Sequence, residues 1–214
     1  EFRRVLFRSL VLHRGSVLFE YYAGAMEPSD LHLLMSVSKS LVSTLCGVFV
    51  DRGLVDLDAA VPEIIEELRG TGWEGCTIQH LLDMRTGTRW DYEADEVTIC
   101  DVSGYRRHSR RDIPPDTASW IRSIGKSQAH GGPFRYVSLA NDVLGWVLER
   151  VGGGPFADLF SREIWSRIGA ERDAAIILDG SGFSVVEGGI CTADRKSTRL
   201  NSSHMAESRM TSSA

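Results

Sequence analysis

The sequence predicts an α+β fold, on three observations. Apolar side chains over residues 36–50 recur with the helical period and share one face, which indicates a buried helix. Residues 10–22 form two extended runs around the turn Arg14-Gly15-Ser16, which is typical of a β-hairpin. Stretches bounded by helix-capping residues fill much of the remaining chain. Because no internal repeat or low-complexity linker divides these elements, we expect one domain.

The first helices have clear boundary signals. The helix of residues 36–50 is expected to end at Asp51-Arg52-Gly53, because a glycine there stops the helical pattern. Pro62 begins a short helix that Gly70 closes. Thr77 caps the helix that follows it, since its hydroxyl can accept a backbone N–H of the first turn.

The second half of the chain alternates irregular and helical stretches. Periodicity is lost over residues 90–115, so we expect a long loop there, acidic at its start and basic at its end. The remaining expected elements are helices at residues 116–124, 139–151 and 155–168, a strand at 174–178 and a Gly-rich loop at 183–193.

The composition is that of an ordinary globular domain. The chain has 214 residues, 43% hydrophobic and 25% charged, with a formal net charge of -5. No apolar run reaches the length of a membrane span, and the mild acidity disfavours a nucleic-acid partner. The four cysteines lack any Cys-x-x-Cys spacing, so we expect free thiols, which favour the cytoplasm over the periplasm. The oligomeric state stays open.

The two ends differ in character from the rest. Residues 1–9 resemble the translation of a sequencing-library adapter in one orientation, and residues 194–204 resemble the same adapter in the other. Residues 208–214 resemble the flow-cell primer that follows it. We therefore expect adapter-derived ends at 1–9 and 194–214, the latter a disordered tail, around a partial domain of residues 10–193.

The helix of residues 36–50 carries the first candidate for chemistry. Ser36 and Lys39 are three residues apart and therefore neighbours on one helix face. A serine hydroxyl becomes a nucleophile when an adjacent base takes its proton, and a lysine desolvated among apolar side chains can lose its charge and act as that base. The helix start also supplies N–H groups suited to an anionic oxygen.

This pattern has a less specific explanation, because Ser-x-x-Lys occurs by chance. A second copy, Ser123-Ile124-Gly125-Lys126, lies in a polar stretch. Lysine usage favours the first copy: the chain has 24 basic residues, and only Lys39, Lys126 and Lys196 are lysines. Arginine cannot be deprotonated in a protein whereas lysine can, so a lysine on the buried face points to use of its titratable amine.

A second motif is Tyr136-Val137-Ser138. Its two polar side chains share a face if the segment is extended. A tyrosine directed at a serine and lysine can relay the serine proton to a leaving group. A tyrosine in an extended segment more often only packs against its neighbours. The motif alone does not decide between a packed tyrosine and a proton relay.

Together the two motifs resemble those of the serine β-lactamase and penicillin-recognising hydrolase superfamily, on its class C and esterase side. The stretches 136–146 and 188–193 are similar to 6-aminohexanoate-dimer hydrolase-like enzymes. The resemblance implies a β-lactamase/transpeptidase-like fold, represented here by most of its helical part and an N-terminal hairpin. It also implies a serine hydrolase of small amide or ester substrates.

The resemblance assigns roles residue by residue. Ser36 would be the acylated nucleophile, Lys39 its base and Tyr136 the second proton-transfer group. Ser138 would contact Lys39 or substrate at a position where many relatives have asparagine, and Tyr92 resembles a substrate-contacting tyrosine of the amide hydrolases. No cofactor or metal is implied, and no His-Glu-x-x-His or phosphate-binding glycine loop occurs.

One departure from the family pattern stands out. The third motif, a Lys-Thr-Gly or His-x-Gly element on a C-terminal strand, has no counterpart, so the C-terminal sheet strands are expected to be missing. That strand supplies one of two oxyanion donors, and loss of such a donor typically costs about a hundred- to a thousandfold in rate. We expect an enzyme whose present 214-residue chain is a poor catalyst or inactive. The alternatives are a class C-type β-lactamase or D,D-peptidase, and a non-catalytic binding member of the fold.

Overall fold

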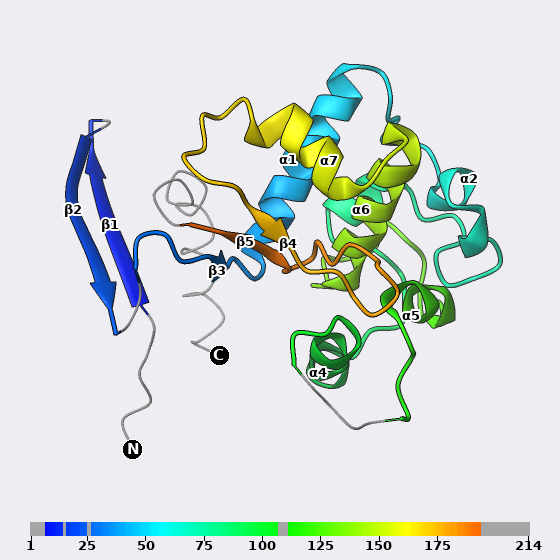
Figure 1. The fold of residues 1–214 in the computed structure, drawn as a ribbon. Helices are drawn as coiled ribbons and strands as arrows, with labels where there is room; N and C mark the ends of the chain where they lie inside the picture. Colours follow the sequence, from blue (N-terminus) through cyan, green and yellow to red (C-terminus); the bar gives the residue numbers. More distant parts are fainter. Residues whose placement is uncertain (1–6, 15, 25–26, 107–110, 194–214) are drawn as a thin grey trace.

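The computed structural model describes residues 7–14, 16–24, 27–106 and 111–193. The predicted adapter-derived tail, residues 194–214, and the first six residues of the predicted adapter-derived start lie outside them. Figure 1 shows a helical body with a small sheet at one side and a separate two-stranded hairpin. The predicted α+β class is confirmed.

The hairpin consists of β1 Phe7–His13 and β2 Ser16–Ala23, paired antiparallel with an irregularity between Val11 and Leu12. It begins three residues before the expected start at Leu10. Leu18 is 64% exposed and Phe19 52%. Successive strand residues point to opposite faces, so neither face of this ribbon is covered by the body, as Figure 1 also shows.

Two long helices form the centre of the body. α1 Val37–Asp51 and α6 Leu139–Gly152 pack against each other, and both agree with the predicted helices. Their apolar faces repeat every three to four residues, so Leu41, Leu45 and Phe49 of α1 line one buried stripe. Around them lie the short helices α2 Val61–Ile64, η1 Glu66–Leu68, α3 Ile78–Leu82, α5 Thr117–Ser123 and α7 Phe156–Phe160 and the π-helical turn η2 Ser161–Trp165.

Capping chemistry sets the starts of two of these helices as the sequence predicts. The Thr77 side chain accepts the backbone N–H of His80, whose ring in turn accepts the N–H of Thr77. The Asp116 carboxylate accepts the backbone N–H of Ser119 at 2.6 Å. The expected single helix over residues 155–168 is instead divided, because α7 passes into the wider π turn at Ser161.

The predicted loop over residues 90–115 is wrong in its first half. Residues Tyr92–Val102 form helix α4, capped by the Asp91 carboxylate, which accepts the N–H of Ala94. Only Ile99, Asp101 and Val102 of this helix are buried, so its apolar stripe is too narrow to give a clear period. The Asp91 cap with Glu93 and Asp95 in the first turn was the available helix signal.

A three-stranded antiparallel sheet, with the order β3-β5-β4, lies beside the start of α1. Its strands are β3 His32–Leu33, β4 Ala175–Ile176 and β5 Ile190–Thr192. β4 falls within the predicted strand, but the predicted loop over 183–193 is wrong at its end, where β5 is the central strand, and β3 was not predicted. Strands of two or three residues carry no readable period and exist through their pairing.

Candidate active site

Ser36 lies at the N-cap of α1, directly after a sharp turn out of β3. Met35 has a φ of 49°, in the left-handed region that costs a non-glycine residue about 1 to 2 kcal/mol. Such strain is kept where the surrounding structure fixes it, and it is common at functional sites. The Ser36 side chain makes no capping hydrogen bond. Its hydroxyl is therefore free to meet other groups.

The structure brings Ser36, Lys39 and Tyr136 together. The Lys39 Nζ lies 3.2 Å from the Ser36 Oγ, and the Tyr136 hydroxyl lies 2.6 Å from the same oxygen. The Lys39 amine is also 5.3 Å from the centre of the Tyr136 ring. Lys39 is only 5% exposed, whereas Ser36 and Tyr136 are half-buried. A hydroxyl reachable from solvent thus has two proton-transferring groups within hydrogen-bond distance.

Glu187 is a site residue that the sequence analysis missed. Its Oε2 accepts a hydrogen bond from the Lys39 Nζ at 3.1 Å, and its backbone carbonyl accepts another at 2.5 Å. The side chains of both residues are 6% exposed. The two residues are 148 positions apart, and a lone glutamate before a glycine pair gave no recognisable pattern.

This carboxylate overturns the expectation that burial leaves Lys39 uncharged. Burial lowers the pKa of Lys39. The negative charge of Glu187, together with smaller contributions from Tyr136 and from hydrogen bonds, raises the pKa by more than burial lowers it. The net pKa of Lys39 lies above its ordinary value. The amine is therefore an ammonium at neutral pH and must lose a proton before it can act as a base.

The segment that presents Glu187 is anchored to both central helices. The Oδ1 of Asp142, on α6, accepts the backbone N–H groups of Val186 at 2.8 Å and Glu187 at 2.9 Å. Ser38, on α1, accepts the N–H of Ile190 at 3.3 Å. Burial, and then the charge of Glu187, raises the pKa of Asp142 well above its ordinary value. These contacts fix the position of Glu187 relative to Lys39.

The two predicted substrate-binding residues take different positions. Tyr92, 59% exposed at the start of α4, faces the Tyr136 ring edge-on at 6.2 Å between centroids, so it borders the site. Ser138 is 1% exposed, and its hydroxyl donates to the Glu96 Oε1 at 2.5 Å, so it contacts Glu96 in place of the expected Lys39. Burial raises the pKa of Glu96.

The second Ser-x-x-Lys copy does not form such a pair. The Ser123 hydroxyl donates to the Trp120 carbonyl at 2.8 Å, and the Lys126 amine donates to the Glu74 carbonyl at 3.2 Å. Both groups are engaged with backbone carbonyls of different segments. The same four-residue pattern therefore gives a candidate site in only one of its two positions.

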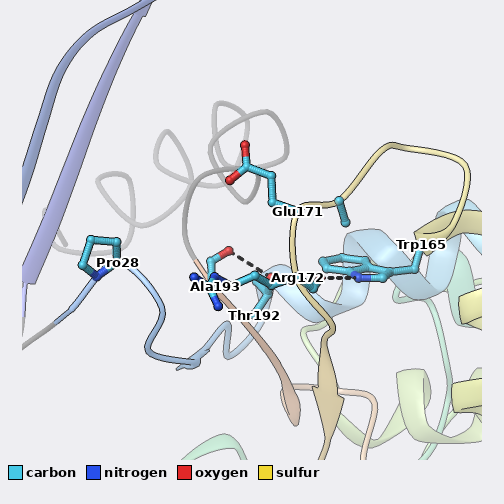
Figure 2. A pocket seen from close by; sticks show the side chains of 7 residues that line it. Pro28, Trp165, Glu171, Arg172, Thr192 and Ala193 are labelled. Carbon is cyan, nitrogen blue, oxygen red and sulfur yellow. Dashed lines mark hydrogen bonds between the residues drawn. The ribbon is translucent and has the colours of Figure 1, made fainter.

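Other features of the described chain do not add to this site. A cavity of about 250 Å³ is lined by Trp165 and Arg172, from η2 and the segment after it, together with Pro28 and Thr192 (Figure 2), and none of the site residues described above lines it. Within the described residues, no cluster of His, Cys, Asp and Glu side chains is able to hold a metal ion. None of the described helices is long and apolar enough to cross a membrane.

Comparison with known proteins shows the family of this chain. A family model described as Beta-lactamase matches residues 9–210. The chain belongs to this beta-lactamase family. It is 38% identical to a 6-aminohexanoate-dimer hydrolase of Paenarthrobacter ureafaciens over 189 residues, which are 86% of this chain and 48% of that protein. It is 31% identical to the esterase EstB of Burkholderia gladioli over 70% of this chain and 41% of that protein.

Solved structures agree on the fold of this beta-lactamase family member. A Bacillus anthracis protein assigned as a 6-aminohexanoate-dimer hydrolase superposes with a TM-score of 0.82 at 21% identity, covering 90% of this chain and 52% of that one. A class C beta lactamase from Rhodobacter sphaeroides gives a TM-score of 0.61 at 20% identity, covering 89% and 58%. The chain thus has the β-lactamase/transpeptidase-like fold and spans about half the length of the curated relatives it matches.

Proposed function

We propose that this chain carries the acylation centre of a serine hydrolase that cleaves amide or ester bonds through an acyl-enzyme on Ser36. The observation that carries the proposal is the Ser36 Oγ, which lies within hydrogen-bond distance of both the Lys39 amine and the Tyr136 phenol. A hydroxyl, an amine and a phenol in mutual contact have the chemistry of nucleophile, base and proton relay. Ser36 is the proposed nucleophile, Lys39 the base and Tyr136 the proton relay.

The proposed reaction has two halves. In the first, neutral Lys39 takes the Ser36 proton, the Oγ bonds to the carbonyl carbon of the substrate, and Tyr136 passes a proton to the leaving amine or alcohol as its bond breaks. In the second, water loses a proton to the same groups, attacks the ester carbonyl and releases Ser36 and the carboxylic acid. The backbone N–H of Ser36, at the positive end of α1, is suited to the oxyanion of both steps.

The relatives support amide and ester substrates. The names of the two curated matches refer to a 6-aminohexanoate dimer, whose units are joined by an amide bond, and to an esterase. We therefore propose a small amide or ester as substrate, with Tyr92 at the rim of the site contacting it. Release of p-nitrophenol from a short p-nitrophenyl ester, turnover of a linear aminohexanoate dimer and turnover of nitrocefin compare the ester, amide and β-lactam reactions directly.

Covalent labelling tests the acyl-enzyme itself. The chain is incubated with a fluorophosphonate, and the adduct is located by intact-mass and peptide mass spectrometry. We expect one adduct on Ser36, abolished in Ser36→Ala and retained in Ser123→Ala, the matched change in the second copy of the motif. The label is expected to form slowly, because one oxyanion donor is expected to be missing. A chain that stays unlabelled after long incubation, or a label that persists in Ser36→Ala, contradicts the proposal and favours a non-catalytic binding protein.

A further inference from the structure

The Lys39 amine has three hydrogen-bond acceptors within 3.2 Å, one for each of its N–H groups. They are the Ser36 Oγ at 3.2 Å, the Glu187 carbonyl oxygen at 2.5 Å and the Glu187 Oε2 at 3.1 Å. An ammonium has three N–H donors, so the charged group is fully satisfied in this setting. Two of the three acceptors belong to one residue, which no comparison assigns to the site.

We propose that Glu187 is a positioning residue for acylation: its carbonyl and carboxylate oxygens hold two bonding directions of the Lys39 amine and leave the third on Ser36. The inference rests on the proposed function. When the ammonium loses one proton to solvent, the two remaining N–H groups still bond to Glu187. The lone pair then faces the Ser36 hydroxyl and can accept its proton. Glu187 thus sets the direction of the base without touching the substrate.

The position of Glu187 is itself fixed on its other side. The Tyr105 hydroxyl donates to its Oε1 at 2.7 Å, so the two carboxylate oxygens have different partners and the group cannot rotate freely. Burial, and then the charge of Glu187, raises the pKa of Tyr105, which keeps that hydroxyl a donor. The Asp142 carboxylate holds the backbone N–H of the same residue at 2.9 Å. Backbone and side chain of Glu187 are both tied in place.

The negative charge of Glu187 has a second effect, on pH dependence. Among the described residues, the titratable groups that interact with Glu187 are Lys39 on α1, Glu96 and Cys100 on α4, Tyr105 after α4 and Asp142 on α6, and the Tyr136 phenol also faces Lys39. Lys39 is the one cation among them, and the charge of Glu187 disfavours its deprotonation. Acylation of Ser36 is therefore expected to rise with pH as Lys39 becomes neutral, and Glu187 moves this rise towards higher pH.

Two substitutions separate the effect of Glu187 on the orientation of the Lys39 amine from the effect of its negative charge. Glu187→Gln keeps the length of the side chain and an acceptor oxygen for Lys39, but removes the charge. Glu187→Asp keeps the charge but shortens the side chain by one methylene, which withdraws the carboxylate from the amine. Glu163→Gln is the matched control, because Glu163 is also a buried glutamate in ion pairs, with Arg52 and Arg162 near the far end of α1.

Two readouts are needed for each variant. The rate of fluorophosphonate labelling of Ser36 is measured against pH, and the Cε signals of isotope-labelled lysine are titrated by NMR. The chain has only three lysines, so Lys→Arg variants at 126 and 196 assign the Lys39 signal. Circular dichroism checks that each variant is folded.

In Glu187→Gln the rise in labelling and the Lys39 titration are expected to move together to lower pH, with about tenfold faster labelling on the acid side. In Glu187→Asp the rise stays near its original pH while the maximal rate falls about ten- to a hundredfold, because the base is misdirected. Glu163→Gln is expected to leave both curves in place. If Glu187→Gln does not fold, Glu187→Asp still tests positioning.

The failure of this inference differs from the failure of the proposed function. A wild-type chain labelled on Ser36, with an unchanged pH curve in Glu187→Gln or an unchanged maximal rate in Glu187→Asp, overturns the role of Glu187 and leaves the acyl-enzyme standing. A wild-type chain that no probe labels at any pH overturns the acyl-enzyme, even where the Lys39 signal responds to Glu187→Gln.

Discussion

Two helical glycines provide a direct test of how the Glu187 segment is held. Gly145 is buried in α6, and a methyl group added there would lie 2.5 Å from the Cγ2 of Val186, the residue before Glu187. Gly47 is exposed in α1, and a methyl group added there would meet nothing within 4 Å. Gly145→Ala and Gly47→Ala are thus the same chemical change with and without a steric conflict.

The magnitudes follow from that geometry. Replacing glycine by alanine inside a helix gains about 1 kcal/mol of helix propensity. Overpacking a buried contact costs about 1 to 3 kcal/mol. Gly47→Ala is expected to raise the free energy of unfolding by about 1 kcal/mol. The free energy of unfolding of Gly145→Ala is expected to lie about 1 to 3 kcal/mol below that of Gly47→Ala. The displaced Val186 also moves the backbone N–H groups that Asp142 accepts, so Ser36 labelling is expected to slow in Gly145→Ala alone.

Urea unfolding followed by tryptophan fluorescence measures both free energies, and fluorophosphonate labelling measures the site. Equal stabilities of the two variants would mean that Val186 yields without cost. Slow labelling in Gly47→Ala would mean that labelling responds to a helix substitution that does not touch Val186. Either result refutes the reasoning that close packing of α6 on Val186 sets the position of Glu187.

Three further predictions concern single groups. Tyr136→Phe keeps the ring beside Lys39 and removes the hydroxyl on Ser36, so labelling is expected to slow about a hundred- to ten-thousandfold with little change in unfolding free energy; an unchanged labelling rate would exclude Tyr136 from proton transfer. Hydrogen bonds from Arg52 and then Arg162 lower the pKa of Glu163 to about 2, so its stabilisation is present above the ordinary glutamate value near 4.5 and lost as pH falls towards 2. Glu163→Gln should therefore weaken the pH dependence of the free energy of unfolding, measured by urea, over that pH range. A dependence as steep as that of the wild type would contradict the ion pairs. Thr77→Ala removes a helix cap and should lower the free energy of unfolding, measured by urea, by about 1 kcal/mol. An unchanged free energy of unfolding would mean that water replaces the hydroxyl.

Local sequence signals were sufficient for the helices with a wide apolar stripe and for two of the helices that a side chain caps. α1 and α6 have such stripes, and Thr77 and Asp116 cap the helices that follow them. The signals failed for α4, although Asp91 caps it, and for β5, which depends on distant partners. α4 buries too few side chains to show a period, and β5 becomes a central strand only because His32 and Ala175 lie on either side of it.

The sequence by itself determined that Ser36 and Lys39 are neighbours, because residues three apart on a helix meet whatever surrounds the helix. Only the tertiary structure decided that Tyr136 reaches the same hydroxyl and that Glu187, 148 positions from Lys39, keeps the amine charged. The physical reason is that the charge of a buried amine depends on burial and on nearby charges, and chain folding brings those charges close from positions that no local spacing encodes.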